Sequence, residues 1–341
     1  MIKLRTIKIK NIDFSVSLKT KIITLFIFIS SLLNAATITS NYTGNWSSSA
    51  TWVGGVVPGA TDNVIIASNH VVTVNGTYSC ANLTIGSNGS SPTLRVTVAA
   101  NSLTINGILT MNAGNFNGTY TLDAGPGTVN INGTVSWAST SGTNLIETTS
   151  SGTLNFGSAI TISKSSQNVK VTASGGTVKF NADVTDQQNK ISIVAGGNSY
   201  FAGSYTVNTT ATTLFASTSN TYFTGSGKSL VTDAAVTFGH CFIDANASVS
   251  TSGSSNITVA GNFELASGSI FTLGNNLYVK LNWTNNGGTL AGGHNHVYLT
   301  ASNSTIRNIN GPYLTTFPNL HIGTPSGSWA VKYNLNTDMT C

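Results

Sequence analysis

Short strands of alternating apolar and polar residues, separated by Gly or Asn turns, recur along almost the whole chain and limit the fold more than any other feature. The segment SLTINGILTMNAGNF (102–116) aligns without a gap with NITVAGNFELASGSI (256–270), so that Gly107 meets Gly261. Apolar side chains occupy the same places in both copies. One such unit cannot bury its apolar face alone, but a stack of units can.

Each unit is a strand of four to six residues, a turn and another strand. Within NLTIG (82–86), Leu83 and Ile85 point to one face of the strand, because successive side chains alternate. The same pattern returns as NLHIG (319–323). Gly and Asn stand where the chain turns, since both tolerate a positive φ. No apolar pattern of helical period follows residue 36, so we predict an all-β chain.

Two architectures accommodate short strands with turns at this spacing. In tandem β-sandwiches the strands pair antiparallel, and the chain divides into domains of about 100 residues. In a parallel β-helix (β-solenoid), successive coils stack ~4.8 Å apart. The apolar ladder continues from Asn41 to Thr340 without a linker or a Pro-rich hinge, which favours the β-solenoid. Coils of ~20 residues would give roughly 12 to 15 coils.

The first 36 residues differ from the rest. Six basic residues precede the apolar stretch IITLFIFISSLL (22–33), and the small-residue site Asn34-Ala35-Ala36 follows. That order is typical of a secretory signal peptide, and the apolar run is shorter than the ~20 residues of a spanning helix. We expect residues 1–36 to be removed, leaving a secreted or outer-cell-surface protein without a transmembrane span.

Charge excludes one class of partner. Six of the 15 Lys and Arg residues and one of the 10 acids lie in residues 1–36, which leaves nine of each and a formal net charge of zero. Nucleic-acid binding needs a basic face that neutralises phosphates, so we predict no nucleic-acid partner.

The three cysteines, Cys80, Cys241 and Cys341, are too few and too widely spaced for a disulfide framework. About eight coils of ~20 residues would separate Cys80 from Cys241, which is far beyond disulfide reach. We expect both to be single, inward-facing thiols.

The stretch GNWSSSATWVGGVVPGATDN (44–63) places two tryptophans beside a Pro-Gly turn. The first coil of a solenoid leaves strand edges and core side chains open, and terminal repeats are therefore atypical. We predict a cap over that end, formed by Trp46, Trp52, Pro58 and Asp62, with Asp62 bonding turn amides. Residues 37–80 would be the cap and first rung, and 81–341 a continuous solenoid.

The same stretch resembles a known family. Residues 44–76, followed by CANLTIGSNG (80–89), resemble the N-terminal segment of large repetitive surface and secreted proteins of Bacteroidota and look like the start of the G-eight domain. Residues 281–323 are similar to a repeat of those proteins, with its W-x-N-N-G-G turn and F-x-N-L-x-I strand. The resemblance implies a lineage and an architecture but no activity. Those proteins usually end in a sorting domain for type IX secretion, whereas this sequence stops at LNTDMTC (335–341), so we interpret it as truncated.

Residues for polysaccharide cleavage are sparse. Glycoside hydrolysis needs two carboxylates about 5 to 10 Å apart. Only Asp183 and Asp186 are close in the sequence after residue 36, and we interpret them as solvated turn residues. A lyase needs a basic residue, and only Arg95 and Arg307 remain as arginines. We predict no catalytic residue and no cofactor.

Two histidines are weak candidates for a metal site. His294 and His296 share a strand face at i, i+2, a spacing that can bind metal. A third ligand would have to come from another coil, from His321 or His240. We interpret this stretch as a polar turn and strand without a metal, and GSGKS (225–229) as a turn, because it lacks the phosphate-loop spacing.

Two classes of function remain. We favour a non-catalytic secreted or cell-surface repeat protein, a structural spacer or an adhesin whose outward Thr, Asn and Ser ladders contact glycans or other surfaces. The alternative is a polysaccharide-active β-helix enzyme, a hydrolase or a lyase. A groove with clustered acids and exposed aromatic side chains on one solenoid face would favour the enzyme.

Overall fold

The structure, a computed structural model, describes residues 35–67, 69–87, 91–111, 117–138, 141–162, 168–187, 190–208, 214–300, 307–323, 333–335 and 339–340. The chain divides into two compact units, residues 1–36 and 37–341. The expected signal peptide lies outside the described residues, except for Ala35 and Ala36, and stays a prediction. None of the helices in the described ranges is long and apolar enough to cross a membrane.

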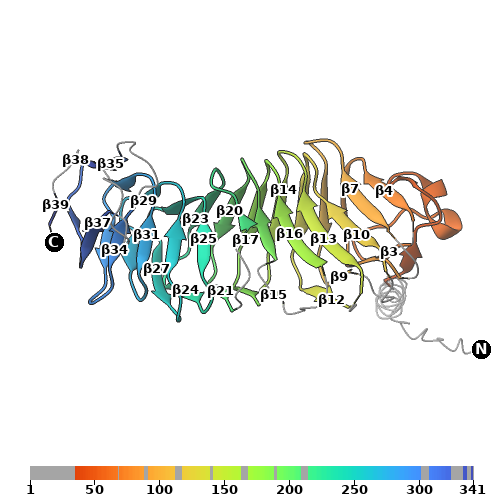
Figure 1. Ribbon diagram of the computed structural model, residues 1–341. Helices are drawn as coiled ribbons and strands as arrows, with labels where there is room; N and C mark the ends of the chain where they lie inside the picture. Colours follow the sequence, from red (N-terminus) through yellow and green to blue (C-terminus); the bar gives the residue numbers. More distant parts are fainter. Residues whose placement is uncertain are drawn as a thin grey trace, which may run out of the picture. The chain divides into compact units, whose positions relative to one another are not determined.

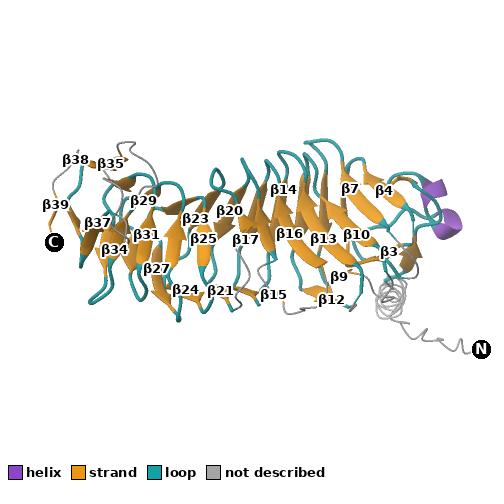
Figure 2. Cartoon of the chain, viewed as in Figure 1, coloured by secondary structure: helices purple, strands orange, loops and turns teal. Residues whose placement is uncertain are grey.

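The second unit is a parallel β-solenoid, which confirms the predicted fold class and rules out tandem β-sandwiches. Equivalent strands of successive coils pair in parallel along the unit. Each coil contributes one strand to each of three faces, as the stacked arrows in Figures 1 and 2 show.

The three faces are built from the following strands. Face 1 carries β1 (Thr37–Thr39), β3 (Asn63–Ile66), β6 (Asn82–Ile85), β9 (Leu109–Met111), β12 (Val135–Trp137), β15 (Ile160–Ile162), β18 (Val184–Asp186), β21 (Tyr205–Val207), β24 (Lys228–Thr232), β27 (Ser248–Ser252), β30 (Ile270–Thr272), β33 (Thr289–Ala291), β36 (Thr315–Thr316) and β39 (Met339–Thr340). Face 2 carries β2 (Gly44–Asn45), β4 (Val71–Val74), β7 (Thr93–Val96), β10 (Thr119–Asp123), β13 (Thr143–Thr148), β16 (Asn168–Ala173), β19 (Ile191–Ile193), β22 (Leu214–Phe215), β25 (Val236–Phe238), β28 (Ile257–Val259), β31 (Leu277–Val279), β34 (Val297–Leu299) and β37 (Leu320–Ile322). Face 3 carries β5 (Thr77–Cys80), β8 (Ser102–Ile105), β11 (Thr128–Ile131), β14 (Thr153–Phe156), β17 (Thr177–Phe180), β20 (Asn198–Phe201), β23 (Asn220–Phe223), β26 (His240–Ile243), β29 (Phe263–Leu265), β32 (Trp283–Asn285), β35 (Arg307–Asn310) and β38 (Tyr333–Leu335).

Face 3 differs from the other two faces in its continuity. Its twelve strands form one hydrogen-bonded sheet, whereas face 1 is divided into three sheets and face 2 into two. Side chains on face 3 therefore stay in register from coil to coil, and long rows of equivalent positions can form there.

The interior follows from the alternation of side chains along each strand. On face 3 one column of inward positions consists of Cys80, Ile105, Ile131, Phe156, Phe180, Phe201, Phe223 and Ile243. The four phenylalanines stack with ring centroids 5.2, 5.0 and 5.5 Å apart. All eight side chains are buried, so this column is a spine of the core.

Coil length changes along the solenoid. On face 3, Asn130 follows its neighbour Thr104 on the previous coil by 26 residues. Farther along, Asn282 follows the equivalent Asn262 by 20 residues. On face 3 the expected ~20 residues per coil therefore holds for the coils between β17 and β32, whereas the last two repeats, β32 to β35 and β35 to β38, are 26 residues again. The described ranges hold fourteen strands on face 1, thirteen on face 2 and twelve on face 3, so the number of coils lies within the 12 to 15 expected.

The predicted aromatic cap is present at the start of the solenoid unit. Two short 3-10 helices, η1 (Ser49–Thr51) and η2 (Val53–Gly55), lie beside β2 at this end (Figure 2, purple). Trp46 and Trp52 are only 0 and 1% exposed, and their rings meet edge to face at 5.1 Å. Trp52 Nε1 donates to the Trp46 carbonyl at 2.7 Å, and Trp46 stacks on Tyr78 of β5. The two rings thus close the first coil.

The other two predicted cap residues shape the turn beneath the tryptophans. The Pro58 carbonyl accepts a hydrogen bond from Trp46 Nε1 at 3.4 Å. The Asp62 carboxylate accepts one from the Gly59 amide at 2.8 Å, the turn contact expected of an aspartate.

Cys80 and Cys241 are buried free thiols on β5 and β26. Seven coils separate the two strands, one fewer than expected, because the early coils are longer. At ~4.8 Å per coil their backbones are about 34 Å apart, so the geometry separates them as predicted. Cys341 lies outside the described residues.

Candidate binding surface

One row of outward side chains runs along face 3 in unbroken register. Each member stands opposite the next on the neighbouring coil, at a repeat of ~4.8 Å. The row consists of Ser79, Thr104, Asn130, Asn155, Lys179, Tyr200, Tyr222, Phe242, Glu264, Thr284 and Asn310. We call it the outer row of face 3.

The first part of the outer row is a ladder of hydroxyl and amide groups. Asn155 Nδ2 donates to Asn130 Oδ1 at 2.7 Å, and Asn130 Nδ2 donates to Thr104 Oγ1 at 3.3 Å. Each amide is thereby oriented by its neighbour on the previous coil. This part of the surface presents fixed polar groups without a charge.

The middle of the outer row is aromatic. Tyr200 and Tyr222 stack with centroids 4.5 Å apart and planes 8° from parallel, and Tyr222 and Phe242 stack at 4.7 Å and 14°. Lys179 precedes these rings and Glu264 follows them. We call these five residues the aromatic stripe.

The stacking decides which parts of the rings reach solvent. Because the faces of neighbouring rings cover each other, the stripe presents ring edges and the two tyrosine hydroxyls outward. Burial, followed by the charges of Tyr200, Asp244 and Glu264, raises the pKa of Tyr222. The Tyr222 hydroxyl therefore stays protonated at neutral pH and can donate a hydrogen bond.

Opposite charges mark the two ends of the aromatic stripe. Lys179 Nζ lies 5.6 Å from the centroid of the Tyr200 ring, within cation–π range. At the other end Glu264 Oε1 accepts a hydrogen bond from Asn286 Nδ2 at 2.7 Å. Four coils, or about 19 Å, separate the two charges. Between them the outer row itself carries no charged side chain, although the charge of Asp244 lies close enough to raise the pKa of Tyr222.

A second aromatic stack lies on face 2. Tyr278 and Tyr298 stack at 4.5 Å and 6°, and Tyr298 stacks on His321 at 4.7 Å and 19°. Its rings stack in the same way as those of the aromatic stripe, but they lie on another face. The face 2 stack can therefore serve as a control for the stripe.

The structure separates the two acids that are close in sequence. Asp183 is exposed, and its carboxylate accepts a hydrogen bond from the Ser204 amide, as expected for a turn residue. Asp186 is only 1% exposed and accepts bonds from the amides of Lys190 and Ile191. The interpretation as a solvated turn residue is wrong for Asp186, because its side chain points inward from β18 and binds the amides at the start of β19.

Two other acids are brought together instead. Asp123 of β10 stands opposite Glu147 of β13 on face 2, with Arg95 opposite Asp123 on the other side. The Asp123 carboxylate accepts bonds from Gly125 N, Thr149 N and Thr149 Oγ1. Burial, and then the Asp123 charge, raises the pKa of Glu147 to about 7. The pair therefore combines an anchored carboxylate with one that takes up a proton near neutrality.

The histidines are arranged differently from the sequence expectation. His294 is exposed in the turn before β34, while His296 Nδ1 lies 2.9 Å from His321 Nε2 on the next coil. His240 is far along the chain on β26, where its Nδ1 accepts a bond from the Asn262 amide. In the described ranges no three His, Cys, Asp or Glu side chains gather as a metal centre. In GSGKS, Gly227 has a positive φ of 67°, as in a turn.

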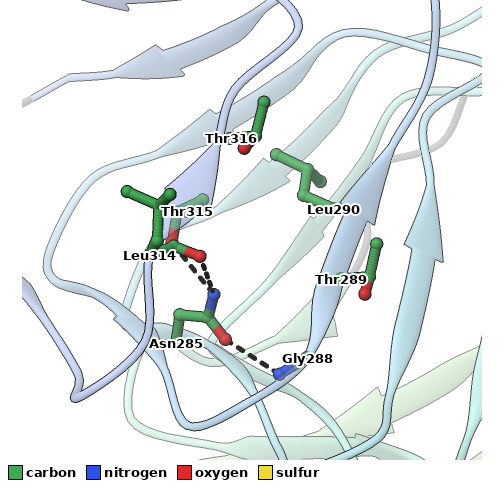
Figure 3. A pocket seen from close by; sticks show the side chains of 7 residues that line it. All are labelled: Asn285, Gly288, Thr289, Leu290, Leu314, Thr315 and Thr316. Carbon is green, nitrogen blue, oxygen red and sulfur yellow. Dashed lines mark hydrogen bonds between the residues drawn. The ribbon is translucent and has the colours of Figure 1, made fainter. Parts of the chain in front are cut away.

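A small cavity lies where β32 and β33 meet the loop before β36 (Figure 3). Its volume is about 150 Å³, below the range of ligand pockets. Asn285 spans it: Nδ2 donates to the Leu314 carbonyl and to Thr315 Oγ1, both at 3.1 Å, and Oδ1 accepts from Gly288 N at 2.9 Å. These bonds connect the loop before β36 to the turn between β32 and β33, so we assign the cavity a structural role.

Sequence reasoning missed the aromatic stripe, although the chain carries a signal for it. Once TVKF (177–180), NSYF (198–201), NTYF (220–223) and HCFI (240–243) are aligned by their turns, Lys, Tyr, Tyr and Phe share the third position. No protein family model, curated protein or solved structure matches this chain. The fold and site thus define a parallel β-solenoid with an outward polar and aromatic row, and function has to be argued from that geometry.

Proposed function

We propose that this protein is a non-catalytic secreted or cell-surface repeat protein, a spacer or adhesin, and that the outer row of face 3 contacts glycans. The observation that carries the proposal is the aromatic stripe in register with an amide ladder. Tyrosine combines an apolar ring with a hydroxyl, which suits ligands that have both apolar and hydroxyl surfaces. A sugar has both.

The regular repeat favours a polymeric ligand over a compact one. Outward positions recur every ~4.8 Å along the solenoid axis, so an extended chain lying along the row meets a regularly spaced series of hydroxyl, amide and aromatic groups. Several weak contacts on one chain add up through effective concentration. The uncharged middle of the stripe suits a neutral polysaccharide.

Binding to immobilised neutral and acidic polysaccharides tests the proposal. We expect the chain to bind a neutral polymer, and the variant Tyr200→Ala/Tyr222→Ala/Phe242→Ala to bind at least tenfold more weakly, about 1.4 kcal/mol. The matched control is Tyr278→Ala/Tyr298→Ala, which removes an equivalent stack from face 2.

Two outcomes would contradict the glycan assignment. One is equal weakening by the face 2 control, which would trace the loss to general destabilisation. The other is unchanged binding after the stripe is removed. Tyr222→Phe keeps the stack and removes one hydroxyl, so it separates hydrogen bonding from packing.

Export is the second part of the proposal and has its own test. The basic and apolar segments of residues 1–33 support a cleaved signal peptide. N-terminal sequencing of protein recovered outside the cell should begin at Ala36 or Thr37, and a sequence that begins at Met1 would rule the leader out.

The acid pair on face 2 favours a second candidate, polysaccharide hydrolysis. A carboxyl with a pKa near 7 can act as a general acid beside an ionised partner. The pair lies on face 2, whereas the aromatic stripe lies on face 3, which is why we rank this candidate below the adhesin. Release of reducing ends from a polysaccharide panel, abolished by Glu147→Gln, would reverse the ranking.

A further inference from the structure

Two imidazoles meet across adjacent coils near the end of the described solenoid. His296 immediately precedes β34, and His321 lies within β37, where it pairs in register with Tyr298. His296 Nδ1 and His321 Nε2 are 2.9 Å apart. The His321 side chain is exposed and that of His296 is half-buried, so an ion in solution can reach both.

The surroundings restrain the His321 ring and the His296 backbone. The Tyr298 ring stacks on His321 with centroids 4.7 Å apart. The His296 amide donates to Asn276 Oδ1 at 2.9 Å, which fixes its backbone against the previous coil. These contacts reduce the side-chain freedom that is lost when a ligand binds and still allow a ring to rotate.

The nitrogen separation matches a metal chelate. Two ligands at right angles around an ion, each with a bond of about 2.0–2.1 Å, have donor atoms about 2.9 Å apart. Right angles are typical of the tetragonal geometry of Cu²⁺ and Ni²⁺, and imidazole is a ligand that both prefer. A modest rotation of the exposed ring turns the hydrogen-bonded pair into a convergent one.

The remaining histidines are less suited to this role. His70 Nδ1 is bonded to Ser40 Oγ at 2.8 Å, and His240 Nδ1 accepts from the Asn262 amide. Burial also lowers the pKa of His240. His294 shares the exposed turn with His296 but has no imidazole neighbour across the described coils, so it serves as a matched control.

We propose that His296 and His321 form a two-imidazole site for a divalent transition-metal ion of the Cu²⁺ or Ni²⁺ class, completed by water. The ion links β34 to β37 and so clamps two adjacent coils of face 2. This site is independent of the glycan-binding proposal, because it lies on another face and uses none of the residues of the outer row.

Calorimetric titration with CuCl₂ and NiCl₂ tests the site, on the untagged chain carrying Cys341→Ser to remove a competing thiol. CaCl₂ is the hard-cation control and should not bind there. We expect one transition-metal ion per chain. His296→Gln and His321→Phe should each weaken its binding at least tenfold, whereas His294→Gln should change it less than twofold. His321→Phe keeps a flat ring against Tyr298.

Three results would overturn the proposal: no saturable binding by the parent chain, tenfold weakening by His294→Gln, or unchanged binding by His321→Phe. A spectroscopic measurement on the parent chain does not depend on whether the variants fold. In the electron paramagnetic resonance spectrum of the Cu²⁺ complex, hyperfine coupling to two imidazole nitrogens supports the site, and coupling to oxygen ligands alone contradicts it.

Discussion

Early and late coils of the solenoid differ in length and in what they present on face 3. The coils from β5 to β14 are the longer ones, and their outer row consists of Ser, Thr and Asn. The coils from β20 to β32 are shorter, and their outer row is largely aromatic. Both regions nevertheless share one uninterrupted sheet on face 3.

The extra length of the early coils lies mostly at one corner. The connection from Met111 of β9 to Thr119 of β10 is longer than the one from Thr272 of β30 to Leu277 of β31. Both connections lead from face 1 to face 2. Insertions are tolerated in such surface connections. The pairing register of face 3 continues through this change in coil length, so its outer row stays aligned.

The largest effect is expected at the capped end of the early region. Trp52→Ala removes a buried ring, its edge-to-face contact with Trp46 and a hydrogen bond, so we expect a loss toward the upper end of ~3–5 kcal/mol. Hydrogen exchange should show the loss in β1 to β4 first. Unchanged protection there, together with unchanged denaturation, would contradict the cap.

A slightly smaller loss of stability is expected at Phe201, where the longer coils are followed by shorter ones. Phe201 is buried between Phe180 and Phe223 and packs on Tyr205, so Phe201→Ala should also cost ~3–5 kcal/mol, without the loss of a hydrogen bond. Tyr200→Ala, on the outer side of the same strand, should cost only ~0.5–1.5 kcal/mol. Chemical denaturation of both variants checks this difference. Equal losses of unfolding free energy would contradict the assignment of Phe201 to the core and Tyr200 to the surface.

The smallest effect is the pH dependence of stability that Glu147 contributes in the early region. Because the folded state raises the pKa of Glu147 to about 7, it binds a proton that the unfolded chain releases near pH 4.5. Stability from this group is therefore full below about pH 4.5 and is lost as pH rises to about 7. Solvent screening of the half-exposed group keeps the loss below the full ~1.4 kcal/mol per pH unit.

Glu147→Gln should remove this slope and leave the protein more stable at pH 8 than the parent chain. Asp123 and Arg95, the charged neighbours in the same row, are unchanged in the variant. Melting temperatures measured between pH 4.5 and 8 check the sign. The difference between the two chains carries the test, because His240, whose pKa is lowered by burial, gives both chains stability as pH rises. A difference in melting temperature that does not grow in favour of Glu147→Gln as pH rises would refute the assignment.

The sequence predicts what repeats locally and misses what depends on coil length. Alternating strands, turns and the Trp46–Trp52 cap are visible in short segments. Neighbours across coils are not, because their spacing varies: Asn130 follows Thr104 by 26 residues, but Asn282 follows Asn262 by only 20 residues. A constant period of ~20 residues pairs the wrong side chains. The acid pair was therefore missed, and so was the stripe, whose signal appears only when the segments are aligned by their turns. The sequence could offer His321 only as one of two possible partners for His296.

Register across the change in coil length is the central claim, and engineered cysteines test it most directly. Lys179 and Tyr200 stand opposite each other on adjacent coils, about 4.8 Å apart, within the ~4.4–6.8 Å that a disulfide spans. In a Cys341→Ser chain, mild oxidation should cross-link Lys179→Cys/Tyr200→Cys within one molecule. Lys179→Cys/Tyr222→Cys, two coils apart, should stay reduced. Mass spectrometry that finds the second pair linked and the first pair free would contradict the register and the stripe built on it.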